Sequence, residues 1–207
     1  MELLLIRHAR PMRLYAAQGQ PDPDLDAEGT AQAEAVAAAL AGEPLVAIWS
    51  SPLRRAQQTA EPLARRHGLT PVLDDGLREL TVGEDSYVPI EARGPATASS
   101  QDMLNEWLTR LHSDEGRALV AAFRGRVSSA VDRIVAAQPH GVVAVVCHGG
   151  VINAVLTEAL GLEALMTFHP DYTSVSRVLV GRSGRRHVAS VNEHAHVRAL
   201  EQAARAR

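Results

Sequence analysis

The chain has 207 residues, of which 46% are hydrophobic and 22% charged, a composition that fits one compact globular domain and argues against disorder as its main state. The formal net charge of −3 and an aromatic content of 3% give no basis for general binding to nucleic acid or an anionic membrane. All 21 basic residues are arginine, which excludes lysine chemistry, so any anion site must use Arg, His and backbone N–H groups.

The first half of the chain alternates apolar runs with helical patterns. Three short apolar runs predict buried strands, at residues 3–6, 45–49 and 72–73. Between them, an Ala-rich stretch predicts a helix over residues 27–40. A second helix is expected to open at Pro52 and to continue to His67, with Gly68 as its stop.

The second half repeats this alternation after an irregular stretch. Residues 80–116 contain turn signals, and we expect this stretch to be a lid or substrate segment. Helical patterns cover residues 103–111, 117–137 and the stretch from Gly149-Gly150 to about Gly161. The most apolar run, 142–146, predicts a strand, and a closing hairpin is expected over residues 175–180 and 187–191.

This order of elements predicts an α/β fold. Alternating strands and helices indicate a three-layer, doubly wound and mostly parallel sheet with helices on both faces, in a single domain over residues 1–207. No apolar stretch approaches the roughly 20 residues that span a bilayer. The single cysteine, Cys147, cannot form an internal disulfide, so a cytoplasmic location is expected.

Polar side chains follow three predicted strands at the points where these strands end. Arg7 and His8 follow the first strand, residues 50–55 follow the second, and residues 147–150 follow the most apolar one. Ligands of doubly wound sheets bind at the carboxyl ends of strands, where helix N-termini add free N–H groups. Two His and up to three Arg at this edge favour a dianion, and phosphate is the obvious candidate.

Each of these residues has an ordinary explanation when it is taken singly. A His after a strand is usually a polar residue at a sheet edge, and Arg54 and Arg55 in a first helical turn are usually solvated. His148 is more suggestive, because the Gly149-Gly150 pair lets the backbone approach a ligand closely. Together these residues occupy three strand ends of one sheet, which favours a shared site over coincidence.

Five segments of the chain carry recognisable motifs. They are Leu5-Ile6-Arg7-His8, Leu25-Asp26-Ala27-Glu28-Gly29 with Gln32-Ala33, Ser50-Ser51-Pro52-Leu53-Arg54-Arg55-Ala56-Gln57-Gln58-Thr59-Ala60, Leu77-Arg78-Glu79 with Gly83, and Val146-Cys147-His148-Gly149-Gly150. In this order they resemble the signatures of the histidine phosphatase superfamily, the phosphoglycerate-mutase-like proteins. Val191-Asn192 with His196 is similar to the terminal strand of that family. The resemblance covers nearly the whole chain.

The resemblance implies a reaction and a role for each matching residue. His8 would be the nucleophile, and Arg7, Arg55 and His148 would hold the phosphoryl oxygens. Glu79 would donate a proton to the leaving group, so the implied catalytic set is His8, Glu79 and His148. Neither a metal ion nor a cofactor is implied, because two Arg and a second His neutralise the phosphoryl charge. This interpretation requires the rings of His8 and His148 to lie close together.

The chain departs from the family pattern at several positions. Ala9 stands where the family has Gly, and Leu14 where it often has Asn. After Gly83, the segment Asp85-Ser86-Tyr87 replaces the usual Trp and Gly. Arg55 fits the phosphate role better than Arg54, because it directly precedes the Ala of the motif. These differences spare the implied catalytic set and leave the substrate open.

Several other residues carry weaker signals that have simpler explanations. Cys147 is expected to be a small apolar strand residue rather than a thiol nucleophile, and His194-x-His196 to be two residues on one face of a strand rather than a metal site. Arg10 and Arg13 could add phosphate contacts, although loop solvation is favoured. Surface or core roles are favoured over pocket lining for Tyr87, Arg93, Trp107, His169 and Tyr172.

The leading hypothesis is a metal-independent phosphomonoesterase, a histidine acid-type phosphatase that works through a phosphohistidine. The first alternative is a phosphoglycerate mutase, the second a non-catalytic phosphate-binding module, and a metal-dependent hydrolase ranks last. The expected partner is a small phosphorylated substrate, with no nucleic acid and no membrane. The sequence identifies neither the physiological substrate nor the oligomeric state, for which a homodimer is one option.

Overall fold

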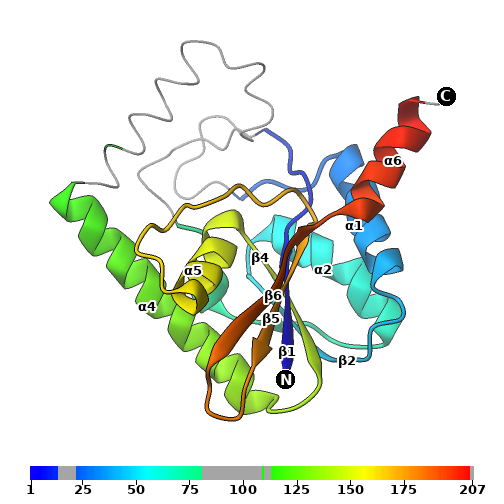
Figure 1. The fold of residues 1–207 in the computed structure, drawn as a ribbon. Helices are drawn as coiled ribbons and strands as arrows, with labels where there is room; N and C mark the ends of the chain where they lie inside the picture. The colour runs from blue at the N-terminus through cyan, green and yellow to red at the C-terminus, as the bar shows by residue number, and fades with distance from the viewer. Residues whose placement is uncertain (14–21, 81–108, 110–112, 206–207) are drawn as a thin grey trace.

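The computed structural model describes residues 1–13, 22–80, 109 and 113–205, and within them a six-stranded sheet has the order β3-β2-β4-β1-β5-β6 (Figure 1). Four strands run parallel, namely β1 (Glu2–Arg7), β2 (Leu45–Ser50), β3 (Val72–Leu73) and β4 (Val142–Cys147). Next to β1, β5 (Val175–Val180) runs antiparallel and forms the expected hairpin with β6 (Arg186–Glu193). The mixed, mostly parallel sheet confirms the predicted class.

Helices cover both faces of this sheet, because its central strands are apolar on both faces (Figure 1). The covering helices are α1 (Ala27–Ala39), α2 (Arg54–His67), α4 (Asp114–Ala137) and α5 (Gly149–Leu160). In β1, Leu3 and Leu5 belong to the core beneath α4 and α5. Leu4 and Ile6 belong to the core beneath α1 and α2. All four side chains are fully buried, and each contributes about 1.5–3 kcal/mol through burial.

Most helix ends lie where the sequence predicts them. Gly68 and Gly161 end α2 and α5 in left-handed conformations, with φ of 66° and 68°. Two starts differ from the prediction. Helix α4 begins at Asp114 rather than at residue 117, because the Ser113 hydroxyl caps it by accepting a hydrogen bond from a backbone N–H. Helix α2 begins at Arg54, two residues after the predicted Pro52.

Three further details differ from the sequence interpretation. Strand β2 is only partly buried, since Val46 is 45% exposed. A short 3₁₀ turn, η1 (Asp75–Leu77), follows β3, and a helix, α6 (Ala195–Arg205), follows β6. His196 therefore lies in a helix, so the expectation of a same-face pair on a strand was wrong.

Several predictions fall on residues that the structure does not describe. Most of the segment 80–116, including the helical pattern at 103–111, lies outside the described residues, so a lid there stays a prediction, as does the single domain. The positions Leu14, Gly83, Asp85, Ser86, Tyr87, Arg93 and Trp107 lie outside them as well. Of the helices described, none is both long and apolar enough to cross a membrane.

Candidate active site

The two histidines that follow β1 and β4 lie side by side at the carboxyl edge of the sheet. The ring centroids of His8 and His148 are 5.1 Å apart, and both side chains are buried. Strands β1 and β4 are parallel neighbours, and Arg7 pairs in register with Cys147, so the residues that follow them lie at the same level. The closeness that the sequence interpretation required is therefore present.

The ring of His8 is oriented by the backbone beside it. Its Nδ1 lies 2.8 Å from the carbonyl oxygen of Ala9, which can only accept a hydrogen bond, so Nδ1 carries the proton. The Nε2 atom of the neutral ring then carries the lone pair. The Ala9 N–H donates to Thr59 Oγ1 over 2.9 Å, which ties this loop to α2. Ala9 is fully buried and its φ is negative, so alanine fits where the motif has glycine.

Arg7 is held by the loop that leads into β5. Its Nη1 donates to the carbonyl oxygen of Pro170 over 2.5 Å and lies 3.1 Å from Nε2 of His169. Its guanidinium carbon lies 4.1 Å from the ring centroid of Tyr172, and that ring lies 5.7 Å from the ring of His8. A cation–π contact of this kind contributes about 0.5–2 kcal/mol. His169, which is exposed, and Tyr172, which is buried, both contact Arg7 and so lie beside the candidate site. Their exposure fits the surface and core roles that the sequence favours.

The same loop is fixed by polar side chains from both sides. Buried Asn153 of α5 donates from Nδ2 to the carbonyl oxygen of Phe168 over 3.0 Å. Thr173 has a φ of 54°, a left-handed conformation that is rare for a β-branched residue. It is held there because its N–H donates to the carbonyl oxygen of Arg7 and its own carbonyl lies 3.1 Å from Nε2 of His196. Burial lowers the pKa of His196.

The two arginines that open α2 have different environments. The side chain of Arg55 is 2% exposed, and its Nη1 lies 3.6 Å from a carboxylate oxygen of Asp22. The side chain of Arg54 is 60% exposed and binds both carboxylate oxygens of Asp24. Of these two neighbours, Arg55 contributes the buried cation, which is the arginine that the motif favours.

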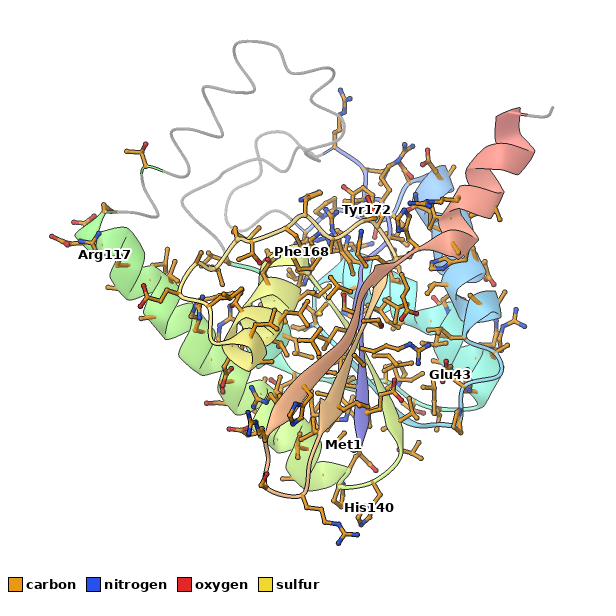
Figure 2. The ribbon with its side chains drawn as sticks, viewed as in Figure 1. Met1, Glu43, Arg117, His140, Phe168 and Tyr172 are labelled. Atoms are coloured by element: carbon orange, nitrogen blue, oxygen red, sulfur yellow. The ribbon has the colours of Figure 1, made fainter. Side chains whose placement is uncertain are left out.

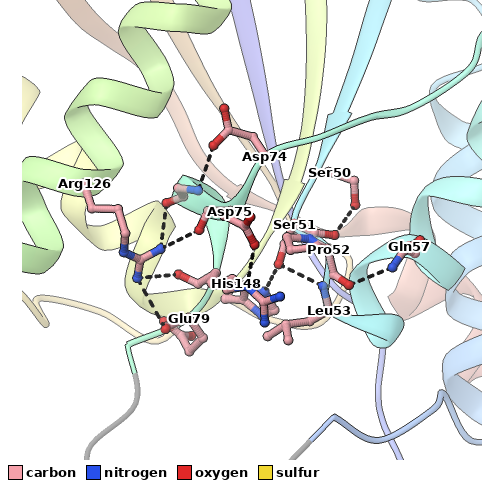
Figure 3. Close-up of polar contacts among 12 residues, drawn as sticks. Ser50, Ser51, Pro52, Leu53, Gln57, Asp74, Asp75, Glu79, Arg126 and His148 are labelled. Carbon is pink, nitrogen blue, oxygen red and sulfur yellow. Dashed lines mark hydrogen bonds and ion pairs between the residues drawn. The ribbon is translucent and has the colours of Figure 1, made fainter. Parts of the chain in front are cut away.

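His148 is buried in its neutral form beside the hydroxyl group of Ser51. Its Nε2 lies 2.8 Å from Ser51 Oγ, which also accepts a hydrogen bond from the N–H of Leu53 (Figure 3). Burial, together with the positive charges of Arg55 and Arg7, lowers the pKa of His148 well below its ordinary value. Among the described residues, His148 Nδ1 has no hydrogen-bond partner although it is buried. Such an orphaned polar atom fits a site that binds an oxygen-rich ligand.

The carboxyl group of Glu79 lies at the N-terminus of α5, directly beyond His148 (Figure 3). Its Oε2 accepts a hydrogen bond from the N–H of Gly150 over 3.1 Å, and its Oε1 accepts one from the N–H of Leu80 over 2.8 Å. A Cβ atom at position 150 would lie 2.3 Å from Oε1. The second glycine of the motif is therefore needed to make room for this carboxyl group.

The motif that opens α1 supports the loop after β1. Asp26 caps the helix by accepting from the N–H of Gly29, and it accepts over 2.7 Å from Nε of Arg10. Gln32 Oε1 accepts from the N–H of Arg10 over 3.0 Å. Arg10 also forms an ion pair with Glu28. Arg10 is thus used to fix the loop; a phosphate contact by Arg13 stays a prediction.

The remaining candidates have structural roles. Cys147 ends β4 and is fully buried, and burial raises the pKa of its thiol, so it is the apolar strand residue that was expected. His194 lies 3.3 Å from a carboxylate oxygen of Asp171. Across the described ranges, no three His, Cys, Asp or Glu side chains are grouped so as to hold a metal ion.

Sequence reasoning missed one arginine that contacts the backbone of Glu79. Arg126 of α4 donates to carbonyl oxygens of the segment that carries this carboxyl group (Figure 3). The helical pattern of α4 also contains Arg117, Arg124 and Arg133, and nothing local distinguishes position 126 from these. Only the packing of α4 against η1 shows its role.

Comparisons with known proteins agree with this geometry. The model of the histidine phosphatase superfamily (branch 1) matches residues 3–194. A protein of Yersinia pestis named probable phosphoglycerate mutase is 31% identical over 166 residues, which are 79% of this chain and 77% of that protein.

Solved structures show the same fold. YhfR of Bacillus stearothermophilus aligns with a TM-score of 0.76 and 23% identity, over 95% of this chain and 98% of that one. A mycobacterial glucosyl-3-phosphoglycerate phosphatase in complex with inorganic phosphate aligns with a TM-score of 0.72 and 26% identity, over 94% and 98% of the two chains.

Proposed function

Since the chain belongs to branch 1 of the histidine phosphatase superfamily, we propose that it is a metal-independent phosphomonoesterase that works through a phosphohistidine on His8. The observation that carries the proposal is the pair of imidazole rings, 5.1 Å apart, at the buried edge that Arg7 and Arg55 also reach. A phosphoryl group carries negative charge on its oxygens, and these residues supply two fixed cations and two ring nitrogens toward it.

In the first step, Nε2 of His8 attacks phosphorus and the P–O bond to the leaving group breaks. The lone pair is available on Nε2 because Nδ1 donates its proton to the carbonyl of Ala9. Arg7 and Arg55 stabilise the charge on the transferring oxygens. The carboxylic acid of Glu79 gives its proton to the departing alkoxide, a contribution of about 10²- to 10⁴-fold in rate.

In the second step, water attacks the phosphohistidine and the P–N bond breaks. Glu79, now a carboxylate, takes a proton from the attacking water, and inorganic phosphate leaves with His8 restored to its neutral form. The N–H of Gly150 bonds to the Glu79 carboxyl group and stabilises its ionised form between the steps.

The neutral ring of His148 contributes a hydrogen bond. Ser51 Oγ already accepts from the N–H of Leu53, so its own proton is available to Nε2 of His148. With Nε2 as acceptor, the proton of the neutral ring lies on Nδ1, the buried atom with no partner among the described residues. We assign Nδ1–H as a donor to a phosphoryl oxygen.

Phosphoglycerate mutase activity is the second candidate, and the 31% identity to a probable phosphoglycerate mutase favours it. We rank it below hydrolysis because a solved relative of 26% identity is a glucosyl-3-phosphoglycerate phosphatase. Phosphoryl transfer between the two phosphoglycerates, measured with and without a bisphosphoglycerate primer, separates the candidates. Primer-dependent transfer that exceeds release of inorganic phosphate would replace the hydrolase proposal.

We propose a small phosphorylated molecule in the cytoplasm as the substrate. A panel of small phosphate esters, assayed with wild type and with His8→Ala, identifies the preferred one. A chain that binds phosphate tightly but turns over no ester would instead be a phosphate-binding module.

The central experiment follows p-nitrophenyl phosphate hydrolysis in the presence of a chelator. We expect wild type to remain active and His8→Ala to lose activity by at least about 10³-fold, with an acid-labile, alkali-stable phosphoenzyme in wild type alone. His140→Ala is the matched control, because His140 is exposed and lies at the opposite end of the sheet from Tyr172 (Figure 2). Activity that disappears in chelator, or persists in His8→Ala, contradicts the proposal.

A further inference from the structure

Arg126 reaches from α4 to four backbone carbonyl groups around Glu79 (Figure 3). Its Nη1 donates to the carbonyl oxygens of Asp75 and Gly76, each over 2.9 Å. Its Nη2 donates to the carbonyl oxygen of Arg78 over 3.0 Å and to that of Glu79 over 3.5 Å. One guanidinium group thus binds both the end of η1 and the backbone of the predicted proton donor.

The helix face of α4 that packs against η1 places Arg126 beside these carbonyl groups. Arg126, Ala130 and Arg133 are spaced by four and three residues, so they share one face of the helix. A Cβ atom at Gly76 would lie 2.6 Å from Cβ of Ala130, so the turn is packed closely on this face. Arg133 binds Asp74, the residue that caps the start of η1. Two arginines therefore hold the two ends of a three-residue turn.

The guanidinium of Arg126 is also partly removed from water. It lies over the ring of Phe123, with 5.0 Å between its carbon and the ring centroid. Burial lowers the pKa of Arg126, and the negative charge of Glu79 opposes this change. Desolvating a cation costs free energy unless acceptors replace its water, and the four carbonyl oxygens supply that replacement.

We propose that Arg126 is a positioning residue, which fixes the backbone of residues 75–79 and thereby holds the carboxyl group of Glu79 at the N-terminus of α5, where it can protonate a leaving group. The inference rests on the proposed function. Arg126 contacts neither the imidazole rings nor the Glu79 carboxyl oxygens through any hydrogen bond that the described residues show, so it acts through the main chain. A three-residue 3₁₀ turn has little stability of its own, so contacts from outside it help to hold its geometry.

The test compares two esters that differ mainly in their leaving group. Phenyl phosphate needs a proton donor for its basic leaving group, whereas p-nitrophenolate leaves without one. We expect Arg126→Met to lower kcat/KM for phenyl phosphate by about 10- to 100-fold and that for p-nitrophenyl phosphate by less than about 3-fold. Arg126→Lys keeps the charge but not the planar fork, and we expect the same selectivity with a smaller loss.

A double-mutant cycle shows whether Arg126 acts through Glu79. We expect Glu79→Gln to give the same selective loss of kcat/KM for phenyl phosphate. In the double variant with Arg126→Met and Glu79→Gln, we expect kcat/KM for phenyl phosphate to fall by less than about 3-fold below the value of Glu79→Gln alone. Arg124→Met is the matched control: it lies on the same helix and donates to carbonyls of Leu162 and Glu163, so the ratio of the two esters should stay at the wild-type value.

Each outcome of this test decides the inference. Equal losses for both esters in the Arg126 variants, unchanged kinetics, or fully additive losses with Glu79→Gln would overturn it while leaving the proposed function intact. If wild type hydrolyses neither ester, or if His8→Ala hydrolyses both, the proposed function is wrong and the inference falls with it.

Discussion

Replacing Gly150 by alanine should move the carboxyl group of Glu79 and leave the rest of the site in place. The added Cβ atom would lie 2.3 Å from Oε1 and 3.3 Å from Cδ of Glu79, and 3.5 Å from Cζ of Phe123. Ordinary contacts between such atoms begin near 3.4 Å, so the carboxyl group must retreat by about 1 Å. The 3.1 Å hydrogen bond from the N–H of Gly150 to Oε2 is then stretched or lost.

The expected cost follows from that displacement. A shift of about 1 Å in a catalytic group lowers the rate by about 10²-fold, so we expect Gly150→Ala to lower kcat/KM for phenyl phosphate by about that factor. Alanine has a higher helix propensity than glycine, so we do not expect this substitution to lower the free energy of unfolding. The assay is steady-state hydrolysis of phenyl phosphate, with thermal unfolding measured on the same samples.

Gly149→Ala provides a control one residue away. Its Cβ atom would meet only Cδ of Pro170, at 3.8 Å, which is an ordinary contact. We expect kcat/KM within about 3-fold of wild type and a stability gain of about 0.5–1 kcal/mol from helix propensity. Wild-type activity in Gly150→Ala, or an equal loss in Gly149→Ala, would refute the steric reasoning.

Three further changes test other parts of the site. In Gly29→Ala, the new Cβ would lie 1.9 Å from a backbone carbonyl oxygen of the loop after β1, so we expect the free energy of unfolding in urea to fall by about 2–3 kcal/mol. In the control Gly42→Ala, the new Cβ meets nothing within 4 Å, and we expect the stability to stay near that of wild type. Ser51→Ala removes the hydrogen-bond partner of His148 Nε2, and we expect kcat/KM to fall by about 10-fold. Ser50→Ala loses only the hydrogen bond from its hydroxyl group to the carbonyl oxygen of Ser51, and we expect it to keep the wild-type kcat/KM. Equal kcat/KM values in the two variants would contradict the role of Ser51 in holding His148. The pKa of His148 is lowered in the fold, so the unfolded chain binds more protons than the folded chain near and below pH 6.5. We therefore expect the free energy of unfolding, measured in urea titrations, to fall as the pH is lowered from 7.5 to 5. A fall of the same size in His148→Gln would contradict this cause.

The sequence alone predicted that the residues at the centre of the candidate site lie together, because the rule for parallel sheets is geometric. His8 and His148 follow strands that are apolar on both faces, and such strands lie in the middle of the sheet with their carboxyl ends at one edge. The choice of Arg55 over Arg54 depended on a motif, and burial of the first with exposure of the second agrees with it.

What the sequence did not indicate depends on packing between distant segments. Tyr172 is 7% exposed and packs against Arg7, just before the antiparallel strand β5. Nothing in the sequence near position 172 indicates Arg7 as its partner. Arg126 looks like any solvated arginine of a helix until η1 is packed against it. The sequence predicts His196 in a strand, because the chain offers no strong stop signal between β6 and α6.

The reversed direction of β5 has a consequence for how this protein could diversify. Strand β5 starts at the level where β1 and β4 end, so the segment that precedes β5 in the sequence lies beside the candidate site. His169 and Pro170 belong to that connection, and both already contact Arg7. Insertions or exchanges between Gly161 and His169 would remodel the surroundings of Arg7 without altering the pairing of any strand. Natural variation or laboratory selection for new esters should therefore concentrate there.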